Sequence, residues 1–305
     1  MVFYNLFNSK EMGVQLVMRI TFLLLLTYEL AEAAAPIAKP NCRSSCGKVQ
    51  IPFPFGIEPD CYLDQWFKIV CNDSGSSAKA FLPSIDMMEV LNISIRDPDY
   101  SSYNPGFIRV NMPIISTSNC NGSRSAGVNM RGSPFFFSSY RNRFISVGCD
   151  NLAVMTGIDP MVVVGCKSDC NTNMIDNKEV KCSGFNCCQT TVPTRIQVFD
   201  VDFKRINESK ASEECKYAFL ADRQWLNNTD PSYDVQYLEY VPVFLEWTAF
   251  FNFSNVVSSE ELRRRNAYRD YTSDYTSDEV QYYFYRCFYG YEGNPYLPTG
   301  CQGKL

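Results

Sequence analysis

The sequence predicts a mainly β protein, made of disulfide-rich β-sandwich or barrel-like domains with a short polar linker and a small cysteine-bounded tail. Its 305 residues, 46% of them hydrophobic, give room for about two domains with real cores. Segments rich in Val, Ile, Phe and Thr recur along the chain, and several alternate in polarity. Clusters of Gly, Pro, Asn and Ser separate them, at the spacing of an all-β domain.

Six segments carry the strand signal most clearly. They are WFKIVC (66–71), VLNISI (90–95), GFIRVNM (106–112), RFISVGC (143–149), TRIQVFDVDF (194–203) and VPVFLEWTAFFNF (241–253). Because side chains alternate between the two faces of a strand, we expect Phe67, Ile69 and Cys71 to face inward, and Trp66 and Lys68 outward. In GFIRVNM we likewise expect Ile108, Val110 and Met112 to face inward, and Phe107, Arg109 and Asn111 outward.

The first 33 residues have the pattern of a secretory signal peptide. Lys10 and Arg19 precede a short apolar run, Ile20 to Tyr28, and Ala31 and Ala33 suit the −3 and −1 positions of a cleavage site. A short signal anchor is the alternative, but nine apolar residues are too few to span a bilayer. No later stretch approaches 18 apolar residues. We therefore expect a secreted, extracellular chain without a transmembrane span.

The cysteine content indicates a disulfide framework. The chain has 14 cysteines and no histidine, which leaves zinc only all-cysteine sites, and no paired CxxC spacing is present. Cys187 and Cys188 are neighbours and should each pair with a different segment. The pairing stays open, and we expect neither a metal nor a cofactor. The predicted disulfide cysteines are Cys42, Cys46, Cys61, Cys71, Cys120, Cys149, Cys166, Cys170, Cys182, Cys187, Cys188, Cys215, Cys287 and Cys301.

Glycosylation sequons agree with an extracellular location. Each predicted site begins N-x-S/T without proline at x and should face solvent. The six sites are Asn72, Asn92, Asn121, Asn207, Asn227 and Asn252.

The C-terminal third changes in character. Cysteines are absent from 216 to 286, and residues 258–286 read as a solvated polar linker that contains a repeated YTSD. Within it, Ser258 and Glu261 have the spacing of a helix capping box. We therefore divide the chain after the signal into β domains at 41–150 and 151–257, the linker, and a tail at 287–305.

Net charge and histidine content exclude several functions. A net charge of −5 argues against a nucleic-acid partner. The missing histidine removes Ser-His-Asp and Cys-His catalysis. Residues 35–195 carry a net charge of +2 and residues 196–305 of −6, so an anionic ligand is better sought in the first half.

One stretch resembles a known family. CRSSCGKVQIPFPFGIEPDCYLDQWFKIVC (42–71) resembles the extracellular galacturonan-binding domain of plant wall-associated receptor kinases. The likeness continues in order through most of the chain, with markers at NRFISVGCD (142–150), GCKSDC (165–170), CSGFNCCQTTVP (182–193), CKYAFLAD (215–222) and GYEGNPYLPTGCQ (290–302). The last marker looks like the start of an EGF-like repeat. The resemblance implies a galacturonan-binding β domain at 41–150, a cysteine-rich β domain at 151–257 and an incomplete EGF-like segment at 287–305.

The tail departs from the family pattern. Kinase-bearing members continue into further EGF-like repeats, a membrane span and a kinase, which this sequence lacks. The usual Cys-x-Cys before the Gly-Tyr-x-Gly run reads Cys287-Phe288-Tyr289, and Gly-Lys-Leu replaces the calcium-binding run. We therefore expect no calcium site in the tail. The resemblance implies a location in the cell wall or apoplast, or at the plasma membrane if the chain is a fragment of a receptor.

The resemblance implies binding to pectin or oligogalacturonides, which needs cations for carboxylates and aromatic faces for sugar rings. Strand faces that combine both give the candidate residues Trp66, Lys68, Phe107, Arg109, Arg141 and Arg143. In the IPFPFG arm (51–56), Phe53 and Phe55 should anchor an extended segment on the core, and a lid is as good a reading there as a binding role.

Three functions remain open. The first is a secreted, non-catalytic pectin-binding module. The alternative is a soluble interaction partner or decoy of wall-associated receptor kinase ectodomains. The third is a carboxylate-based glycosidase, which needs two Asp/Glu side chains at a cleft, although no motif points to a pair.

Overall fold

A computed structural model describes residues 15, 17–22, 36–74, 77–95, 106–118, 120, 126–156, 164–170, 182–205, 215–248, 257–271 and 283–303. The chain divides into two units, Met1–Pro36 and Ile37–Leu305. In the first, residues 17–22 are helical and lie inside the predicted signal peptide. Nowhere in the described ranges is a helix long and apolar enough to cross a membrane.

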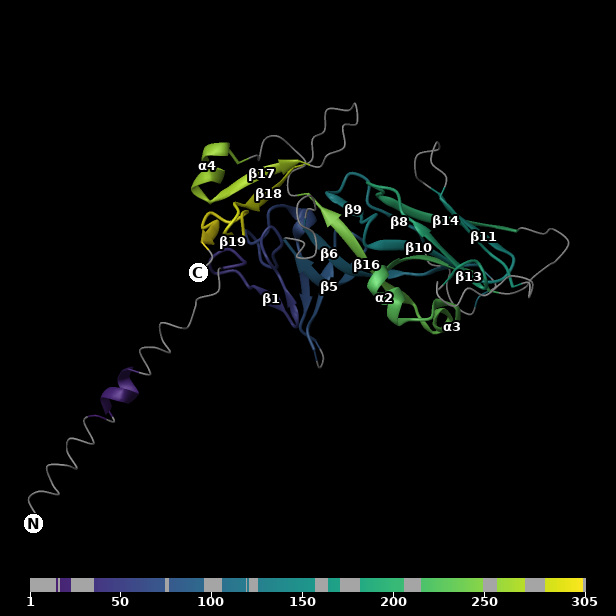
Figure 1. The fold of residues 1–305 in the computed structure, drawn as a ribbon, viewed down its shortest axis with the longest axis horizontal. Coiled ribbons are helices and arrows are strands. Elements are labelled where there is room, and N and C mark those ends of the chain that lie inside the picture. Colours follow the sequence, from purple (N-terminus) through teal and green to yellow (C-terminus); the bar gives the residue numbers. More distant parts are fainter. Residues whose placement is uncertain are drawn as a thin grey trace, which may run out of the picture. The chain divides into compact units, whose positions relative to one another are not determined.

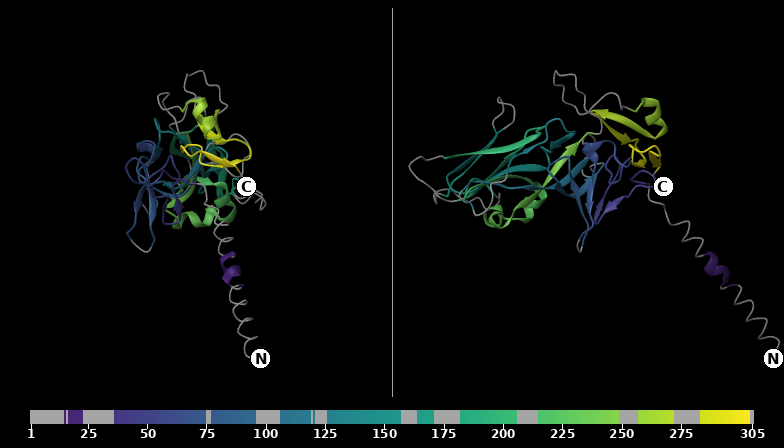
Figure 2. Two further views of the ribbon diagram at one scale, coloured as in Figure 1. Left: turned by 90° about the vertical axis from the view of Figure 1, so that its left-hand side faces the viewer. Right: turned by 180° about the vertical axis from the view of Figure 1, so that it is seen from behind.

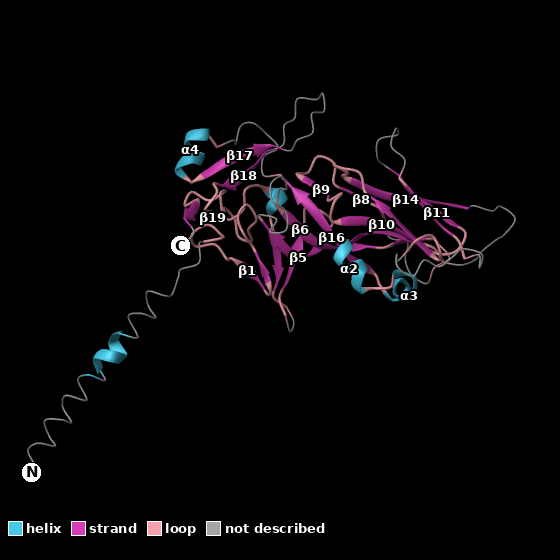
Figure 3. Ribbon diagram, viewed as in Figure 1, coloured by secondary structure: helices cyan, strands magenta, loops and turns pink. Residues whose placement is uncertain are grey.

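Strands dominate the second unit, as Figure 3 shows, and every pairing within the sheets is antiparallel. The fold is therefore mainly β, as the sequence predicts. The largest sheet has six strands in the order β3 (Val70–Asn72), β4 (Lys79–Leu82), β5 (Met88–Ser94), β6 (Phe107–Pro113), β16 (Tyr240–Trp247) and β9 (Phe135–Phe137).

Two four-stranded sheets follow. The first has the order β13 (Cys187–Thr191), β10 (Asn142–Val147), β15 (Tyr217–Asp222) and β7 (Ile115–Ser116). The second has the order β12 (Gly165–Ser168), β11 (Asn151–Thr156), β14 (Val198–Arg205) and β8 (Val128–Asn129).

The remaining elements are short (Figures 1 and 2). Three strand pairs stand alone: β1 (Ser45–Cys46) with β2 (Val49–Gln50), β17 (Ala267–Tyr271) with β18 (Tyr283–Cys287), and β19 (Tyr291–Gly293) with β20 (Cys301–Gly303). The helices are η1 (Gln65–Phe67), α2 (Arg223–Asn228), α3 (Pro231–Asp234), η2 (Val235–Tyr237) and α4 (Ser259–Arg264).

The sheets are joined by buried rings, a disulfide and one asparagine. Phe144 of β10 and Phe199 of β14 lie 6.1 Å apart between the two four-stranded sheets, and the Cys166–Cys188 disulfide links β12 to β13. The buried Asn142 side chain donates to the Phe244 carbonyl at 2.8 Å and accepts from the Phe244 N–H at 3.0 Å, which ties β10 to β16. Because β10 pairs with β13 and β15, one sheet contains strands from both sides of residue 150. The domain boundary drawn there stays a prediction.

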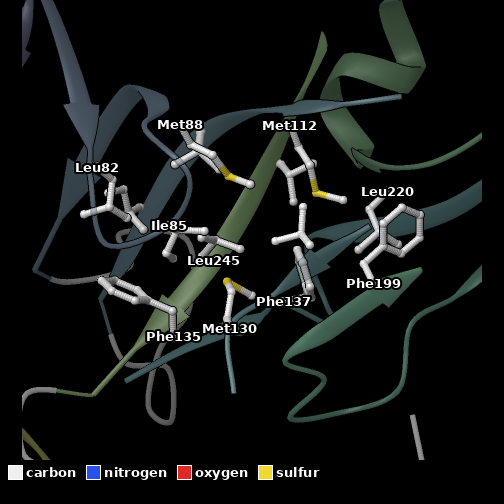
Figure 4. Close-up of a cluster of buried hydrophobic side chains, with 14 of the residues drawn as sticks. Leu82, Ile85, Met88, Met112, Met130, Phe135, Phe137, Phe199, Leu220 and Leu245 are labelled. Atoms are coloured by element: carbon white, nitrogen blue, oxygen red, sulfur yellow. The ribbon is translucent and has the colours of Figure 1, made fainter. Parts of the chain in front are cut away.

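A continuous apolar core fills the second unit (Figure 4). Met88 of β5, Met112 of β6 and Leu245 of β16 come from the six-stranded sheet, whereas Leu220 and Phe199 come from the two smaller ones. Burying a side chain of this kind stabilises a fold by about 1.5–3 kcal/mol. The inward pattern predicted for Ile108, Val110 and Met112 is confirmed, since all three are fully buried.

The arm at 51–56 packs as the sequence suggests, without forming a strand. Ile51, Phe53 and Phe55 are buried. Trp247 lies at the centre of the rings beneath this arm, 5.5 Å from Phe55, 5.8 Å from Phe67 and 5.5 Å from Tyr296. We call these four residues the aromatic hub.

The segment expected as a linker, 258–286, contains packed structure where it is described. Ser258 caps α4 by accepting from the Glu261 N–H at 3.1 Å, and Leu262 and Phe284 are buried. The buried Asn294 side chain then donates to the carbonyls of Ile37 at 2.9 Å and Phe53 at 2.7 Å. Apolar residues between the polar ones explain the packing, while most of the YTSD repeat lies outside the described residues.

All fourteen cysteines form disulfides. Adjacent Cys187 and Cys188 pair with different partners, and Cys287 pairs with Cys301 around the tail loop. The pairs are Cys42–Cys61, Cys46–Cys71, Cys120–Cys215, Cys149–Cys170, Cys166–Cys188, Cys182–Cys187 and Cys287–Cys301.

Candidate functional site

Four arginines from distant parts of the sequence come together around the start of β10. We call Arg109, Arg141, Arg143 and Arg223 the arginine cluster. Arg109 lies on β6, Arg141 in the turn before β10, Arg143 on β10 and Arg223 at the start of α2. Pairing of β10 with β15 places Arg143 opposite Ala221, two residues before Arg223.

Arg109 is neutralised inside the protein. Its Nη2 atom lies 2.7 Å from Oδ2 of Asp222, whose side chain is only 2% exposed. Asp222 also caps α2 by accepting from the Gln224 N–H at 2.8 Å. Removing one partner of such a pair would leave a buried charge uncompensated. Arg109 is thus better suited to holding β6 against β15 than to meeting a ligand.

Arg141 covers Phe107, which corrects the expectation that Phe107 faces outward. Phe107 is 7% exposed, because the Arg141 guanidinium lies 4.8 Å above its ring and the Phe244 ring lies 5.0 Å away. The same guanidinium lies 4.9 Å from the Phe244 ring. Strand alternation alone misses this, because the covering group comes from a different segment.

Arg143 and Arg223 supply the accessible charge. Burial, with a smaller contribution from the nearby Arg223 charge, lowers the pKa of the Arg143 guanidinium. Arg223 is exposed, and it lies 5.5 Å from the ring of Tyr140, which is itself 43% exposed. Within the described part of the chain neither arginine pairs with a carboxylate. Two close, like charges and an open aromatic ring favour an anionic ligand with an apolar face.

A hollow of about 530 Å³ lies beside these residues, along edge strand β13. Arg143 and the exposed Lys167 of β12 bring two cations to it, and the Cys166–Cys188 disulfide holds β12 beside β13. Polar groups make up much of the remaining lining. The lining residues are Arg143, Lys167, Cys182, Ser183, Gly184, Cys188, Gln189, Thr190 and Thr191. We call this hollow the β13 groove.

Trp66 and Lys68 belong to a separate segment. Residues 65–67 form the 3-10 helix η1, and the strand begins only at Val70. Phe67 and Ile69 are buried as predicted, but Trp66 is partly buried against the core. Among the described interactions, neither Trp66 nor Lys68 meets the arginine cluster.

Sequence reasoning missed Arg223, Lys167 and Tyr140. Tyr140 stood beside a chosen residue, so an exposed aromatic at a turn was available as a signal. No sequence signal pointed to Arg223 or Lys167. Arg223 comes near Arg143 through the pairing of β10 with β15, and Lys167 through the Cys166–Cys188 disulfide.

Three predicted glycosylation sites can be placed, and Asn72, Asn92 and Asn227 are all exposed. Asn121, Asn207 and Asn252 lie outside the described residues. Glycosylation stays a prediction at all six positions.

The fold and its crosslinks define the class first: a disulfide-bonded β module with a cationic groove on its surface. Residues 42–102 match the family described as wall-associated receptor kinase galacturonan-binding, and residues 179–256 match the family described as wall-associated kinase. The chain therefore carries two ectodomain-type regions of wall-associated receptor kinases.

Relatives in Arabidopsis thaliana have the same family description. Wall-associated receptor kinase-like 6 is 34% identical over 291 residues, which cover 86% of this chain and 44% of that protein. Wall-associated receptor kinase-like 10 is 32% identical over 327 residues, covering 92% of this chain and 40% of the relative. The chain thus spans less than half the length of either relative. No solved structure matches it.

Proposed function

We propose that this protein is an extracellular, non-catalytic module that binds galacturonan, the acidic chain of pectin, through the arginine cluster and the β13 groove. One observation carries the residue assignment: Arg143 and Arg223 lie side by side without a carboxylate partner among the described residues, next to a groove that Lys167 also lines. The match of residues 42–102 to a galacturonan-binding family supports the ligand class.

The chemistry of the ligand fits these groups. Galacturonan carries one carboxylate per unesterified sugar, and a planar guanidinium can contact a carboxylate through two parallel hydrogen bonds. A carboxylate between Arg143 and Arg223 would offset the Arg223 repulsion, which adds to burial in lowering the pKa of Arg143. The groove's threonines, Thr190 and Thr191, offer hydroxyls to the sugar hydroxyls, and Tyr140 offers a ring face.

Retention on immobilised polygalacturonate tests the assignment. The combined change Arg143→Ala, Arg223→Ala and Lys167→Ala should reduce retention about tenfold or more, because it removes three positive charges from one surface. The matched control is Arg263→Ala with Arg264→Ala and Lys79→Ala, which removes three exposed cations elsewhere. Equal retention of both variants would contradict the assignment.

Two further measurements define the mode of binding. Retention should weaken as salt rises from about 0.05 to about 0.5 M, because the Debye length then falls from about 14 Å to about 4 Å. Incubation with polygalacturonate should release no reducing ends, and their release would show a glycosidase instead of a binding module.

A further inference from the structure

A second surface of the protein has the opposite chemistry to the arginine cluster. Tyr233, Tyr237 and Tyr240 are 65%, 73% and 55% exposed, and they lie within eight residues of one another. We call them the tyrosine platform. Single exposed aromatic residues are ordinary, but the neighbouring rings of Tyr233 and Tyr237, with exposed Tyr240 three residues further along the chain, mark a candidate binding surface.

Local structure explains why the first two rings stand together. Asp230 caps α3 by accepting from the Ser232 N–H at 3.1 Å, and η2 continues the helical run to Tyr237. Tyr233 and Tyr237 are therefore four positions apart on one helical run and share a face. Their ring centroids lie 6.3 Å apart, with an angle of 59° between the ring planes. Pro231 and Val235 are buried and fix the run to the protein.

The stretch of chain that carries the platform is acidic, which disfavours an anionic ligand. From residue 224 to residue 246 the sequence contains no Lys or Arg but four carboxylates, Asp230, Asp234, Glu239 and Glu246, the first three of them between residues 230 and 240. Galacturonan would be repelled here, in contrast to the arginine cluster.

The composition of the surface also argues against a protein partner. Every large apolar residue exposed between 223 and 247 is a tyrosine, and aliphatic side chains there, such as Leu226, Val235 and Val241, are buried. Protein interfaces combine aromatic anchors with an apolar centre. A pyranose ring instead presents a C–H face that stacks on an aromatic ring and a rim of hydroxyls. The carboxylates and the Gln236 side chain next to the platform can accept from such hydroxyls.

We propose that the tyrosine platform binds a neutral polysaccharide chain, so that this protein carries a second glycan site distinct from its galacturonan site. The angle between Tyr233 and Tyr237 suits a single twisted chain in solution, because the flat face of a crystalline polysaccharide would need coplanar rings.

Affinity electrophoresis in gels containing hydroxyethylcellulose or soluble galactan tests the proposal. The protein is run before and after enzymatic removal of N-glycans, because Asn227 is a sequon near the platform. We expect retardation in at least one gel. The change Tyr233→Ala with Tyr237→Ala should weaken binding about tenfold or more, since each ring supplies stacking and apolar contact. Tyr289→Ala, which removes a fully exposed tyrosine elsewhere, should leave it unchanged.

This experiment distinguishes the two proposed glycan sites. The tyrosine variant should keep its retention on polygalacturonate, and the variant lacking Arg143, Arg223 and Lys167 should keep its retardation by the neutral polymer. No retardation of either protein form in either gel overturns the proposal, as does equal retardation of the tyrosine variant. Sedimentation with microcrystalline cellulose would assign the platform to a crystalline surface. A dimer in analytical ultracentrifugation that the tyrosine variant no longer forms would assign it to a second copy of the chain. Either result would also overturn the proposal.

Discussion

The aromatic hub around Trp247 and the β13 groove beside Arg143 are held together in different ways. The hub joins the arm, η1, β16 and the tail through buried rings and carries no charged side chain. The groove is lined by cations and polar groups, and two disulfides, Cys166–Cys188 and Cys182–Cys187, hold its walls. The walls of a polar groove that is open to water cannot be held by apolar packing, so covalent crosslinks hold them instead.

The largest effect should come from the hub. Trp247→Ala should lower the free energy of unfolding by about 3–5 kcal/mol, because it empties the contact point of Phe55, Phe67 and Tyr296. Guanidinium-induced unfolding with disulfides intact measures this change. Tyr289→Ala is the control and should change stability by less than about 0.5 kcal/mol. A Trp247→Ala protein with unchanged stability would contradict the role of the hub, and the folded fraction should still bind polygalacturonate.

Removing one groove disulfide should affect both stability and binding. Cys166→Ala with Cys188→Ala should cost about 3 kcal/mol of stability, since the bond closes a loop of 22 residues. Retention on polygalacturonate should also fall, because β12 with Lys167 is no longer held beside β13.

The Cys287–Cys301 pair provides the matched control for that change. It closes a loop of 14 residues in the tail, so Cys287→Ala with Cys301→Ala should lose similar stability while retention stays intact. Loss of retention in both double variants would mean that the groove has no special dependence on its disulfide.

A smaller effect concerns pH at the hub. Burial raises the pKa of the Tyr296 hydroxyl, which also accepts from the Tyr285 N–H at 3.1 Å. The unfolded chain ionises this tyrosine near pH 10, whereas the folded chain keeps it neutral to higher pH. Stability from Tyr296 is therefore complete below about pH 10 and is lost as pH rises above it.

Tyr296→Phe separates these two contributions. At pH 7 the variant should lose about 1–3 kcal/mol, because a buried N–H is left without its acceptor. Above about pH 10 its free energy of unfolding should fall less steeply than that of the unchanged protein. Chemical denaturation at pH 7, 10 and 11 measures both, and parallel pH profiles would show that Tyr296 titrates alike in both states.

Local features of the fold could be predicted from the sequence. The inward residues of β6, the cap at Ser258 and the burial of Phe53 and Phe55 all follow from alternation, capping chemistry and proline placement. These features depend on neighbours within a few positions, so local sequence patterns are enough to predict them.

Features that depend on pairing between distant segments could not be predicted from the sequence. Arg223 reaches Arg143 only because β10 and β15 are neighbours, Phe107 is buried only because Arg141 covers it, and fourteen cysteines allow too many pairings to choose among. The packed tail was missed for the same reason, since Asn294 finds its partners more than 240 positions away at Ile37 and Phe53.

The contact of Asn294 with Ile37 has a mechanical consequence. It places the entry of the compact unit, at residue 37, beside a residue near its exit, so tension applied through residues 37 and 303 would act on this one spot. Such loading peels hydrogen bonds apart singly, whereas tension across opposite ends of a sheet strains many at once. The arm and tail would separate first, while the β13 groove and the tyrosine platform kept their shape.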